Sequence, residues 1–318
     1  MKIITEVTAE KLTPQIHWEE GVFMIGSCFA DEIGALLKSH GFDCCTNPFG
    51  TQYNVLSIFN SLKRLSDTAA FLSTAADSED SMEDSLDLEA NDEYPFFTPT
   101  EVFQRPDGLY VTFSHHSRCG SKDREQFLQR ANRELVESAK KLRAANFLII
   151  TLGTSFVYLN SSSNVVSNCH KLPAKEFVKQ YIHTLQCAET LQKIIELFPD
   201  KKIIFTVSPI RHLGEGAHLN QISKSTLLLA VQRVIYGTSF SLNIQNKNLY
   251  YFPSYEIMMD ELRDYRWVGE DLSHPTHSAV KYIFEKFKEA CIDPSAYALM
   301  TKAFKENQFL NHKPLSER

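Results

Sequence analysis

A serine near the start of the chain stands where a nucleophile can be activated. Ser27 follows Gly26 and the short apolar run 22–25, so it is predicted at the turn from a buried strand into a helix. A serine hydroxyl is a weak nucleophile unless a base takes its proton, and the N-terminus of a helix offers free N–H groups to an oxyanion. The alternative is that Ser27 only caps that helix.

A carboxylate and an imidazole lie close together near the other end of the chain. Asp271 and His274 are three residues apart, and Pro275 suits the first position of a helix that follows. At this spacing the two side chains can meet beside a helix start. Asp271 would then hold His274 in one tautomer and leave the other ring nitrogen to act as a base. The alternative is a surface cap with no catalytic role.

Other polar residues could bind a substrate or replace the serine. His170, and Arg211 with His212 after a predicted strand, could bind a substrate or an anion, although such residues are more often structural or solvated. Cys28 could be the nucleophile in place of Ser27, but one position on in a helical first turn it is expected to point elsewhere and pack as a thiol. The eleven histidines show no HExxH pattern or close pair, so no metal or other cofactor is predicted.

The composition excludes several classes of protein. The chain has 318 residues, 43% of them hydrophobic, with a net charge of −6 and a pI near 6.0, so no basic surplus points to nucleic acid. No run approaches the roughly 18 apolar residues that span a bilayer, and the N-terminus has no signal pattern. A cytoplasmic protein without membrane contact is therefore expected. Its seven cysteines are odd in number and are expected to be reduced.

Apolar runs that alternate with helical patterns indicate the fold class. Buried strands ending at polar or glycine residues and separated by amphipathic helices predict an α/β fold, a three-layer α/β/α sandwich with a mostly parallel five-stranded sheet. The expected strands are 22–25, 42–46, 147–152, 202–207 and 249–252. The expected helices are 28–40, 55–65, 125–145, 174–198, 222–236, 255–263 and 276–290, with a hairpin over 102–113.

The chain is predicted to form one domain over residues 1–318. Residues 67–101 contain no lysine or arginine, and nine acidic residues fall between positions 77 and 93, so this region is expected to be an acidic insertion or flexible loop. Residues 293–318 are expected to form a C-terminal tail. In parallel sheets, sites form outside the carboxyl ends of the strands. The polar and glycine residues expected there are Ser27, Asn47, Gly50, Gly153, Ser155, Ser208, Arg211 and His212.

Several blocks of the sequence resemble one family. Gly26-Ser27-Cys28-Phe29-Ala30 matches the signature that names the GSCFA family. The resemblance covers about residues 20–290 and continues through blocks that occur in order: 47–54, 151–154, 168–171, 206–212, 252–256 and 260–266, followed by His274-Pro275. The GSCFA family is similar to the SGNH/GDSL hydrolases, which have a three-layer, flavodoxin-like α/β/α fold.

This resemblance implies roles for individual residues. Ser27 falls at the first-block nucleophile, where Gly-Asp-Ser is usual and this chain has Gly-Ser-Cys. Gly50 falls near the second-block glycine, whose N–H helps to form the oxyanion hole. Ser155 replaces the third-block asparagine and can still donate one hydrogen bond. Asp271 and His274 match the fifth-block Asp-x-x-His.

These inferences converge on a serine hydrolase that cleaves an ester, expected to be an O-acyl (acetyl) group on a carbohydrate. Ser27, His274 and Asp271 would form the triad, and Ser27, Gly50 and Ser155 the oxyanion hole. The predicted substrate contacts are Asn47, Gly153, Thr154, His170, Arg211 and His212. The alternatives are a non-catalytic carbohydrate- or acyl-binding module on the same fold and an O-acyltransferase. The predicted partner is a small-molecule or glycan ester, and the sequence indicates no oligomeric state.

Overall fold

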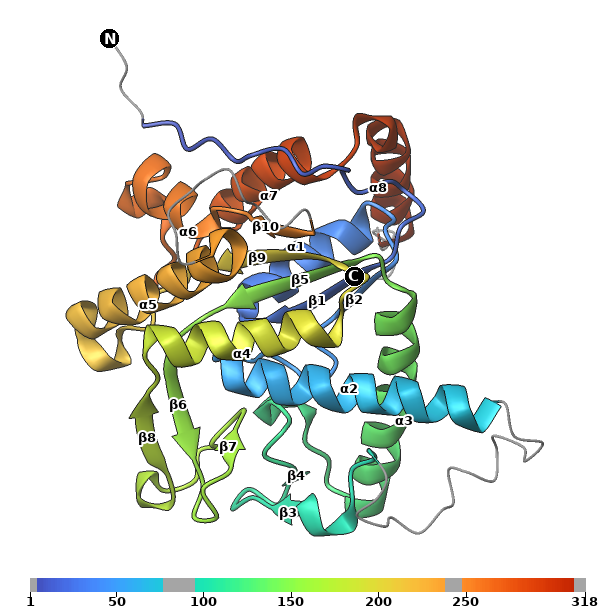
Figure 1. Ribbon diagram of the computed structural model, residues 1–318, viewed down its shortest axis with the longest axis vertical. Helices are drawn as coiled ribbons and strands as arrows, with labels where there is room; N and C mark the ends of the chain where they lie inside the picture. Colours follow the sequence, from blue (N-terminus) through green and yellow to red (C-terminus); the bar gives the residue numbers. More distant parts are fainter. Residues whose placement is uncertain (1–4, 77–94, 238–247, 312–318) are drawn as a thin grey trace, which may run out of the picture.

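A five-stranded parallel sheet lies at the centre of the molecule (Figure 1). The computed structural model describes residues 5–76, 95–237 and 248–311. The strand order is β10-β9-β5-β1-β2, and every neighbouring pair is parallel. The strands are β1 (Val22–Gly26), β2 (Cys44–Thr46), β5 (Phe147–Leu152), β9 (Lys202–Val207) and β10 (Leu249–Tyr251). The predicted α/β class and five-stranded sheet are confirmed.

Helices cover both faces of this sheet, as Figure 1 shows. One face carries α1 (Cys28–Ser39), α7 (His277–Cys291) and α8 (Tyr297–Asn311). The other carries α2 (Val55–Ala76), α3 (Arg124–Ala144), α4 (Thr184–Leu197) and α5 (Gly216–Tyr236). Side chains of β1 alternate between the two cores, with Phe23 in one and Met24 in the other. This burial on both faces explains why the strands read as continuous apolar runs.

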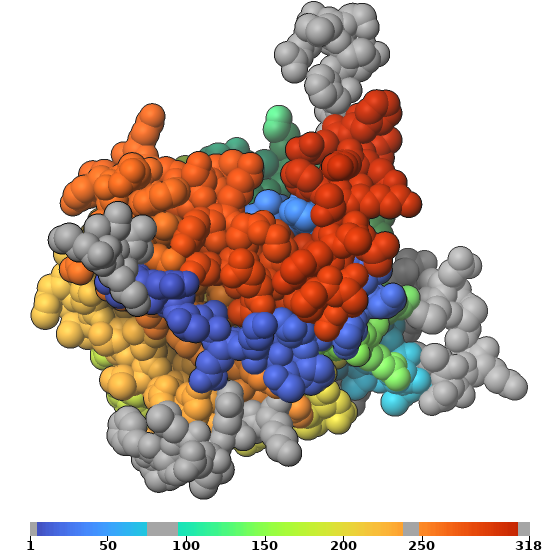
Figure 2. Space-filling model, turned by 90° about the horizontal axis from the view of Figure 1, so that it is seen from above, coloured from blue at the N-terminus to red at the C-terminus, as the bar shows by residue number. Residues whose placement is uncertain are grey.

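The N-terminal segment crosses the outside of the face formed by α7. Figure 2 shows it as a blue band against the red and orange C-terminal helices. The Leu12 N–H donates to Ala290 O at 2.9 Å and the Ile16 N–H to Cys291 O at 2.8 Å, and both leucine and isoleucine side chains are buried. These contacts attach the start of the described chain to the end of α7.

A small antiparallel sheet extends the carboxyl edge of the main sheet. It has the order β7-β6-β8 and consists of β6 (Phe156–Leu159), β7 (Val165–Val166) and β8 (Val178–Tyr181). The helix predicted over 174–198 is therefore wrong in its first part, since α4 begins only at Thr184. Residues 178–181 pair with β6 instead, and helical spacing within one segment cannot reveal a partner strand. The hairpin predicted over 102–113 is present as β3 (Phe103–Gln104) and β4 (Tyr110–Val111).

Two further segments differ from the sequence-based expectations. Helix α2 continues to Ala76, inside the region 67–101 that was expected to be a loop, while the acidic residues of 77–93 lie outside the described residues. The stretch expected as a C-terminal tail contains α8, in which Met300 is buried and Phe304 stacks on His40 with ring centroids 4.6 Å apart. Within the described residues, no helix is long and apolar enough to cross a membrane.

Candidate active site

Asp271 and His274 form a hydrogen-bonded pair in the loop before α7. Asp271 Oδ1 accepts hydrogen bonds from the Ser273 and His274 N–H groups, both at 2.9 Å, and Oδ2 contacts His274 Nδ1. These bonds, the backbone ones first, lower the pKa of Asp271 to about 2. The carboxylate therefore holds a proton on Nδ1, and Nε2 is left without a hydrogen-bond partner in the described chain. The side chains of both residues are about half exposed (52% and 49%).

The loop that carries this pair is attached to the carboxyl edge of the sheet. The Arg211 N–H, in the loop after β9, donates to Ser273 O at 3.1 Å, and the Gly269 N–H donates to His274 O at 2.7 Å. Thr276 then caps α7 by accepting a bond from the Ala279 N–H. The imidazole is thus placed above the sheet at the end where β1, β5 and β9 terminate.

Ser27 lies at the predicted turn, and its hydroxyl accepts a hydrogen bond from its own helix. The side chain is fully buried, and its Oγ accepts a hydrogen bond from the Phe29 N–H at 3.3 Å, so Ser27 is the N-cap of α1. Its own N–H donates to Thr151 O at 3.0 Å. No hydrogen bond in the described chain joins Ser27 to His274. This is the helix-capping geometry of the alternative interpretation, in which the hydroxyl can still donate a hydrogen bond of its own.

Cys28, the first residue of α1, lies closer to the molecular surface than Ser27 does. It is partly exposed, and its Sγ is 3.4 Å from the Tyr53 hydroxyl. Burial, followed by the hydrogen bond and charge of Cys28, raises the pKa of Tyr53. The phenol therefore stays protonated and can donate a hydrogen bond. The Cys28 N–H makes no hydrogen bond within the described residues, as is usual in a first helical turn.

A network around Asp31 fixes the loop that follows β2. Asp31 Oδ1 accepts a hydrogen bond from Asn47 Nδ2 at 2.7 Å, and Oδ2 accepts from Thr51 at 3.2 Å and Arg118 at 2.9 Å. Asn47 Oδ1 also accepts from the Gly26 N–H at 2.8 Å. Asn47, predicted to contact substrate, therefore uses both ends of its amide inside the protein, and it braces the turn before α1.

Of the three predicted oxyanion donors, the N–H groups of Ser27 and Gly50 are already paired within the protein. The Gly50 N–H donates to Asn47 O at 2.8 Å, and a Cβ on Gly50 (φ 78°) would lie 2.4 Å from His116 Cβ. Gly50 is needed for this tight turn and not as a free donor. Ser155 is fully buried, its N–H donates to Ser223 Oγ at 2.7 Å, and its own hydroxyl has no partner among the described residues.

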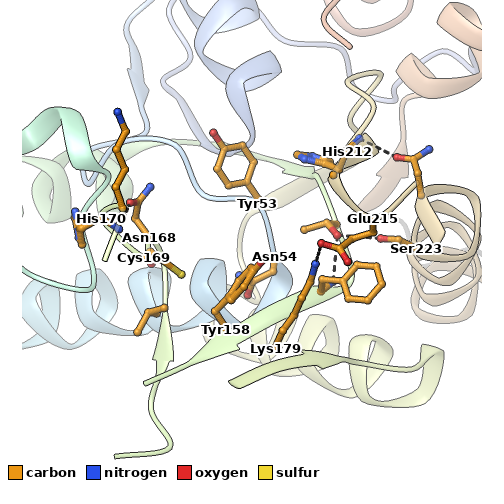
Figure 3. Close-up of a pocket in the computed structure, with 17 residues that line it drawn as sticks. Tyr53, Asn54, Tyr158, Asn168, Cys169, His170, Lys179, His212, Glu215 and Ser223 are labelled. Carbon is orange, nitrogen blue, oxygen red and sulfur yellow. Dashed lines mark hydrogen bonds and ion pairs between the residues drawn. The ribbon is translucent and has the colours of Figure 1, made fainter. Parts of the chain in front are cut away.

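A cavity of about 420 Å³ opens beside these residues, between the small sheet and the loop after β9 (Figure 3). Tyr53 and Asn54 form part of its wall. Of the predicted substrate contacts, Thr154, His170 and His212 line it, whereas Asn47, Gly153 and Arg211 do not. The remaining lining residues include the aromatic Phe156 and Tyr158 and the polar Ser167, Asn168, Lys179, Glu215, Asn220 and Ser223.

The two cavity histidines lie on opposite sides of Tyr53 in Figure 3. Burial lowers the pKa of His170 to about 4, and burial together with the charges of Lys224 and His274 lowers that of His212 to about 3. His170 Nε2 bonds to Thr112 O at 2.9 Å, but its Nδ1 and the Nε2 of His212 are buried without partners in the described chain. Both rings are thus neutral and each presents an unsatisfied nitrogen.

Comparison with known proteins identifies the family. The GSCFA family model matches residues 21–287, most of the chain. The chain belongs to the GSCFA family. Among curated proteins, none matches the sequence. Among solved structures, an acetyl xylan esterase (Est2A) from the rumen bacterium Butyrivibrio proteoclasticus is similar, with 11% identity and a TM-score of 0.34. The match covers 90% of this chain and 65% of the esterase chain, so this protein spans less than two thirds of the esterase's length.

An ion pair stands at one wall of the cavity of this GSCFA protein. Lys179 of β8 contacts Glu215, and its ammonium lies 4.7 Å from the ring centre of Phe156 and 5.4 Å from that of Tyr158. Figure 3 shows Lys179 and Glu215 joined beside Tyr158. Lys179 was not predicted as a site residue because residues 174–198 were expected to form one helix.

A buried lysine ties the sheet edge together in this GSCFA protein. Lys224 of α5 is 1% exposed and donates to Gly153 O at 2.7 Å and Ser208 O at 2.8 Å. Burial lowers its pKa to about 7. The two carbonyls follow β5 and β9, so Lys224 holds adjacent strand ends in position. A lysine in a helix is normally at the surface, and nothing in the sequence marks this one.

Proposed function

We propose that this GSCFA protein hydrolyses an ester through a covalent acyl-enzyme, with His274 as the general base and Asp271 as its orienting carboxylate. The observation that carries the proposal is the Asp271–His274 pair at the carboxyl edge of the sheet, in which His274 Nε2 has no partner in the part of the chain that the structure describes. A carboxylate that fixes the tautomer and stabilises the imidazolium is what a base of this kind requires.

The reaction would have two halves. In the first, His274 Nε2 takes the proton of a nucleophile at the start of α1, the nucleophile attacks the acyl carbonyl, and the proton passes to the departing alcohol. In the second, the same nitrogen deprotonates a water that releases the carboxylic acid. The Cys28 N–H, unpaired within the described residues, would stabilise the oxyanion of each tetrahedral intermediate.

We further propose that the substrate is an O-acyl, in particular O-acetyl, group on a carbohydrate. The cavity supports this because it combines aromatic faces at Phe156 and Tyr158 with hydrogen-bonding groups at Asn168, Lys179 and Glu215. Its volume of about 420 Å³ lies within the range of small-molecule sites. A sugar has apolar faces and polar edges, and this lining offers partners for both.

The proposal can be tested by measuring acetate release from p-nitrophenyl acetate and from acetylated xylo-oligosaccharides. His274→Asn should lower kcat by at least about a thousandfold. The matched control is His277→Asn, an exposed histidine three residues further on with no hydrogen bond in the described chain, which should behave as wild type. Equal rates for His274→Asn and wild type would show that the pair is not a catalytic base.

A non-catalytic binding module is the second candidate. It is favoured because the Ser27 hydroxyl caps α1 and the Gly50 N–H donates to Asn47 O. It predicts calorimetrically measurable binding of acetylated xylo-oligosaccharides that the protein never cleaves. Acyl transfer would share the acyl-enzyme, and an acetylated sugar product formed when a sugar acceptor is added would distinguish it from hydrolysis.

A further inference from the structure

We propose that the nucleophile of this reaction is the thiol of Cys28 and that Ser27 serves as the cap that places it. This inference rests on the proposed ester hydrolysis and specifies its first covalent step. It would make the protein a cysteine-dependent esterase that passes through a thioester.

The contacts of the two neighbouring residues differ in the way the proposal requires. Ser27 is 0% exposed and its oxygen already accepts the Phe29 N–H, so attack on a substrate would remove a buried cap. Cys28 is partly exposed, and its sulfur contacts only the Tyr53 hydroxyl among polar groups of the described chain. The sulfur can therefore reach a substrate without disrupting the helix.

Topology brings Cys28 and His274 to the same place. Helices α1 and α7 pack against each other on one face of the sheet, and both run away from its carboxyl edge (Figure 1). Packed helices lie about 8–10 Å apart. Cys28 is the first residue of α1 and His274 precedes α7 by three residues. The proposal requires a thiol and an imidazole that extend from these two adjacent helix starts to share a proton.

The groups around the sulfur suit an oxyanion. Cys28 stands at the N-terminus of a 12-residue helix, where the macrodipole favours the negative charge of a tetrahedral intermediate. The protonated Tyr53 hydroxyl, 3.4 Å from the sulfur, and the Cys28 N–H, which has no partner among the described residues, are two donors for the oxyanion that the paired Gly50 N–H does not provide.

A second observation points to a ligand beside this thiol. Tyr53, which contacts the sulfur, also forms part of the wall of the 420 Å³ cavity. Another wall residue, His170, is 1% exposed and has an Nδ1 atom with no partner in the described residues. A buried nitrogen of this kind normally has a hydrogen-bond partner, and a sugar hydroxyl in the cavity would supply one. Cys28 and His274 are not among the residues that line the cavity, so a carbohydrate held there would extend its ester past Tyr53 to reach them.

The chemistry balances without a further reagent. His274 takes the thiol proton, the sulfur forms a bond to the acyl carbon, and the carbon–oxygen bond to the sugar breaks as the sugar oxygen takes that proton. Water then gives a proton to His274 and its hydroxide attacks the thioester. The carbon–sulfur bond breaks, and the thiol recovers its proton from His274 while the acid departs.

The experiment is to incubate the full chain with p-nitrophenyl acetate, stop the reaction with acid, and locate the acetyl group by peptide mass spectrometry. We expect it on Cys28, and we expect neutral hydroxylamine to remove it, as it does for a thioester. His274→Asn should abolish this label, which separates it from unassisted acetylation of Cys119 or Cys169. Ser27→Ala should keep the label with a lower melting temperature, whereas Cys28→Ala should lose at least about a thousandfold in kcat.

The outcomes separate the two proposals. A hydroxylamine-resistant acetyl on Ser27, with an active Cys28→Ala variant, would overturn the thiol while leaving the ester hydrolase intact. If Cys28 is labelled to the same extent in His274→Asn, the assignment of the thiol as nucleophile is also overturned. If no residue is acetylated and no ester is cleaved, both proposals fail. The labelled position in the wild-type chain decides the question even if Cys28→Ala does not fold.

Discussion

The Tyr53 hydroxyl lies 3.4 Å from the Cys28 sulfur, and the Tyr53 carbonyl oxygen accepts the N–H groups of Gly153 and Thr154, both at 2.8 Å. The main chain of Tyr53 is thus fixed to the end of β5, while its side chain reaches the start of α1. The ring also packs edge-on against His212, with centroids 5.4 Å apart. Tyr53 therefore links the segments that follow β1, β5 and β9, and it positions its hydroxyl at the candidate site.

This arrangement predicts the effect of removing that hydroxyl. Tyr53→Phe should lower kcat for p-nitrophenyl acetate by about a hundredfold with little change in KM, because an oxyanion donor acts mainly in the transition state. Tyr297→Phe, at the start of α8, removes a hydroxyl bonded to Lys288 O of α7; it is the control and should keep full activity. A rise in KM without a fall in kcat would show instead that Tyr53 only binds the substrate.

The orienting carboxylate should be nearly as important as the base. Asp271→Asn keeps a similar shape but cannot accept the Nδ1 proton in the same way, so His274 would lose its fixed tautomer and the stabilisation of its charge. We expect kcat to fall by roughly a thousandfold or more. Steady-state rates for this variant and for Asp264→Asn, another exposed aspartate that caps a short helix, provide the comparison. Matching activities for the two variants would rule out an orienting role.

The same carboxylate should also contribute to stability in a defined pH range. Its pKa is lowered from 3.8 to about 2 by the hydrogen bonds of His274 and Ser273. Because the folded pKa is below the unfolded one, the contribution is complete above pH 4 and is lost as the pH falls toward 2. The difference in urea midpoint between wild type and Asp271→Asn should shrink over this interval. A difference that stays constant from pH 5 to pH 2 would contradict this.

Much of the scaffold could be predicted from the sequence, because its strands are continuous apolar runs closed by glycine or polar residues. The predicted strands 147–152 and 202–207 coincide with β5 and β9. Residues 178–181 could not be placed in the same way, because a short exposed strand gains its hydrogen bonds from β6 and not from its own pattern. Helix α8 was missed for a similar reason, since its weak pattern gives no sign of the packing of Met300.

The site was predictable in its residue types but not in its contacts. Asp271 and His274 were recognised by their spacing, and the turn at Gly26 by the apolar run before it. Which of Ser27 and Cys28 faces the solvent depends on the direction in which a capping side chain points, and the sequence does not give that. In the Gly-Asp-Ser block usual in the SGNH/GDSL hydrolases the serine is the third residue. In the corresponding Gly26-Ser27-Cys28 of this chain, the third residue is Cys28. Tyr53 stood in a recognised block, yet its distance to the sulfur required coordinates.

Lys224 predicts an unusual pH dependence of folding. Burial lowers its pKa from 10.5 to about 7, so between these values the unfolded chain binds a proton that the folded chain does not. Stability attributable to this residue must therefore rise with pH from about 7 to 10. Urea unfolding of wild type and Lys224→Met should diverge in favour of wild type across this range. The exposed Lys193→Met is the control and should show no such trend, and parallel curves for Lys224→Met would contradict the lowered pKa.

The cavity gives a prediction that separates binding of a sugar from the chemical step. Tyr158 presents an aromatic ring in the cavity wall without contacting Cys28. Tyr158→Ala should raise KM for acetylated xylo-oligosaccharides by about tenfold, equivalent to about 1.4 kcal/mol, because the sugar loses its apolar partner. The rate with p-nitrophenyl acetate, which has no sugar, should be unaffected. Phe309→Ala removes an aromatic ring that is 82% exposed on α8 and should change neither substrate's kinetics. Equal loss with both substrates would mean that Tyr158 supports the catalytic groups and that the carbohydrate lies elsewhere.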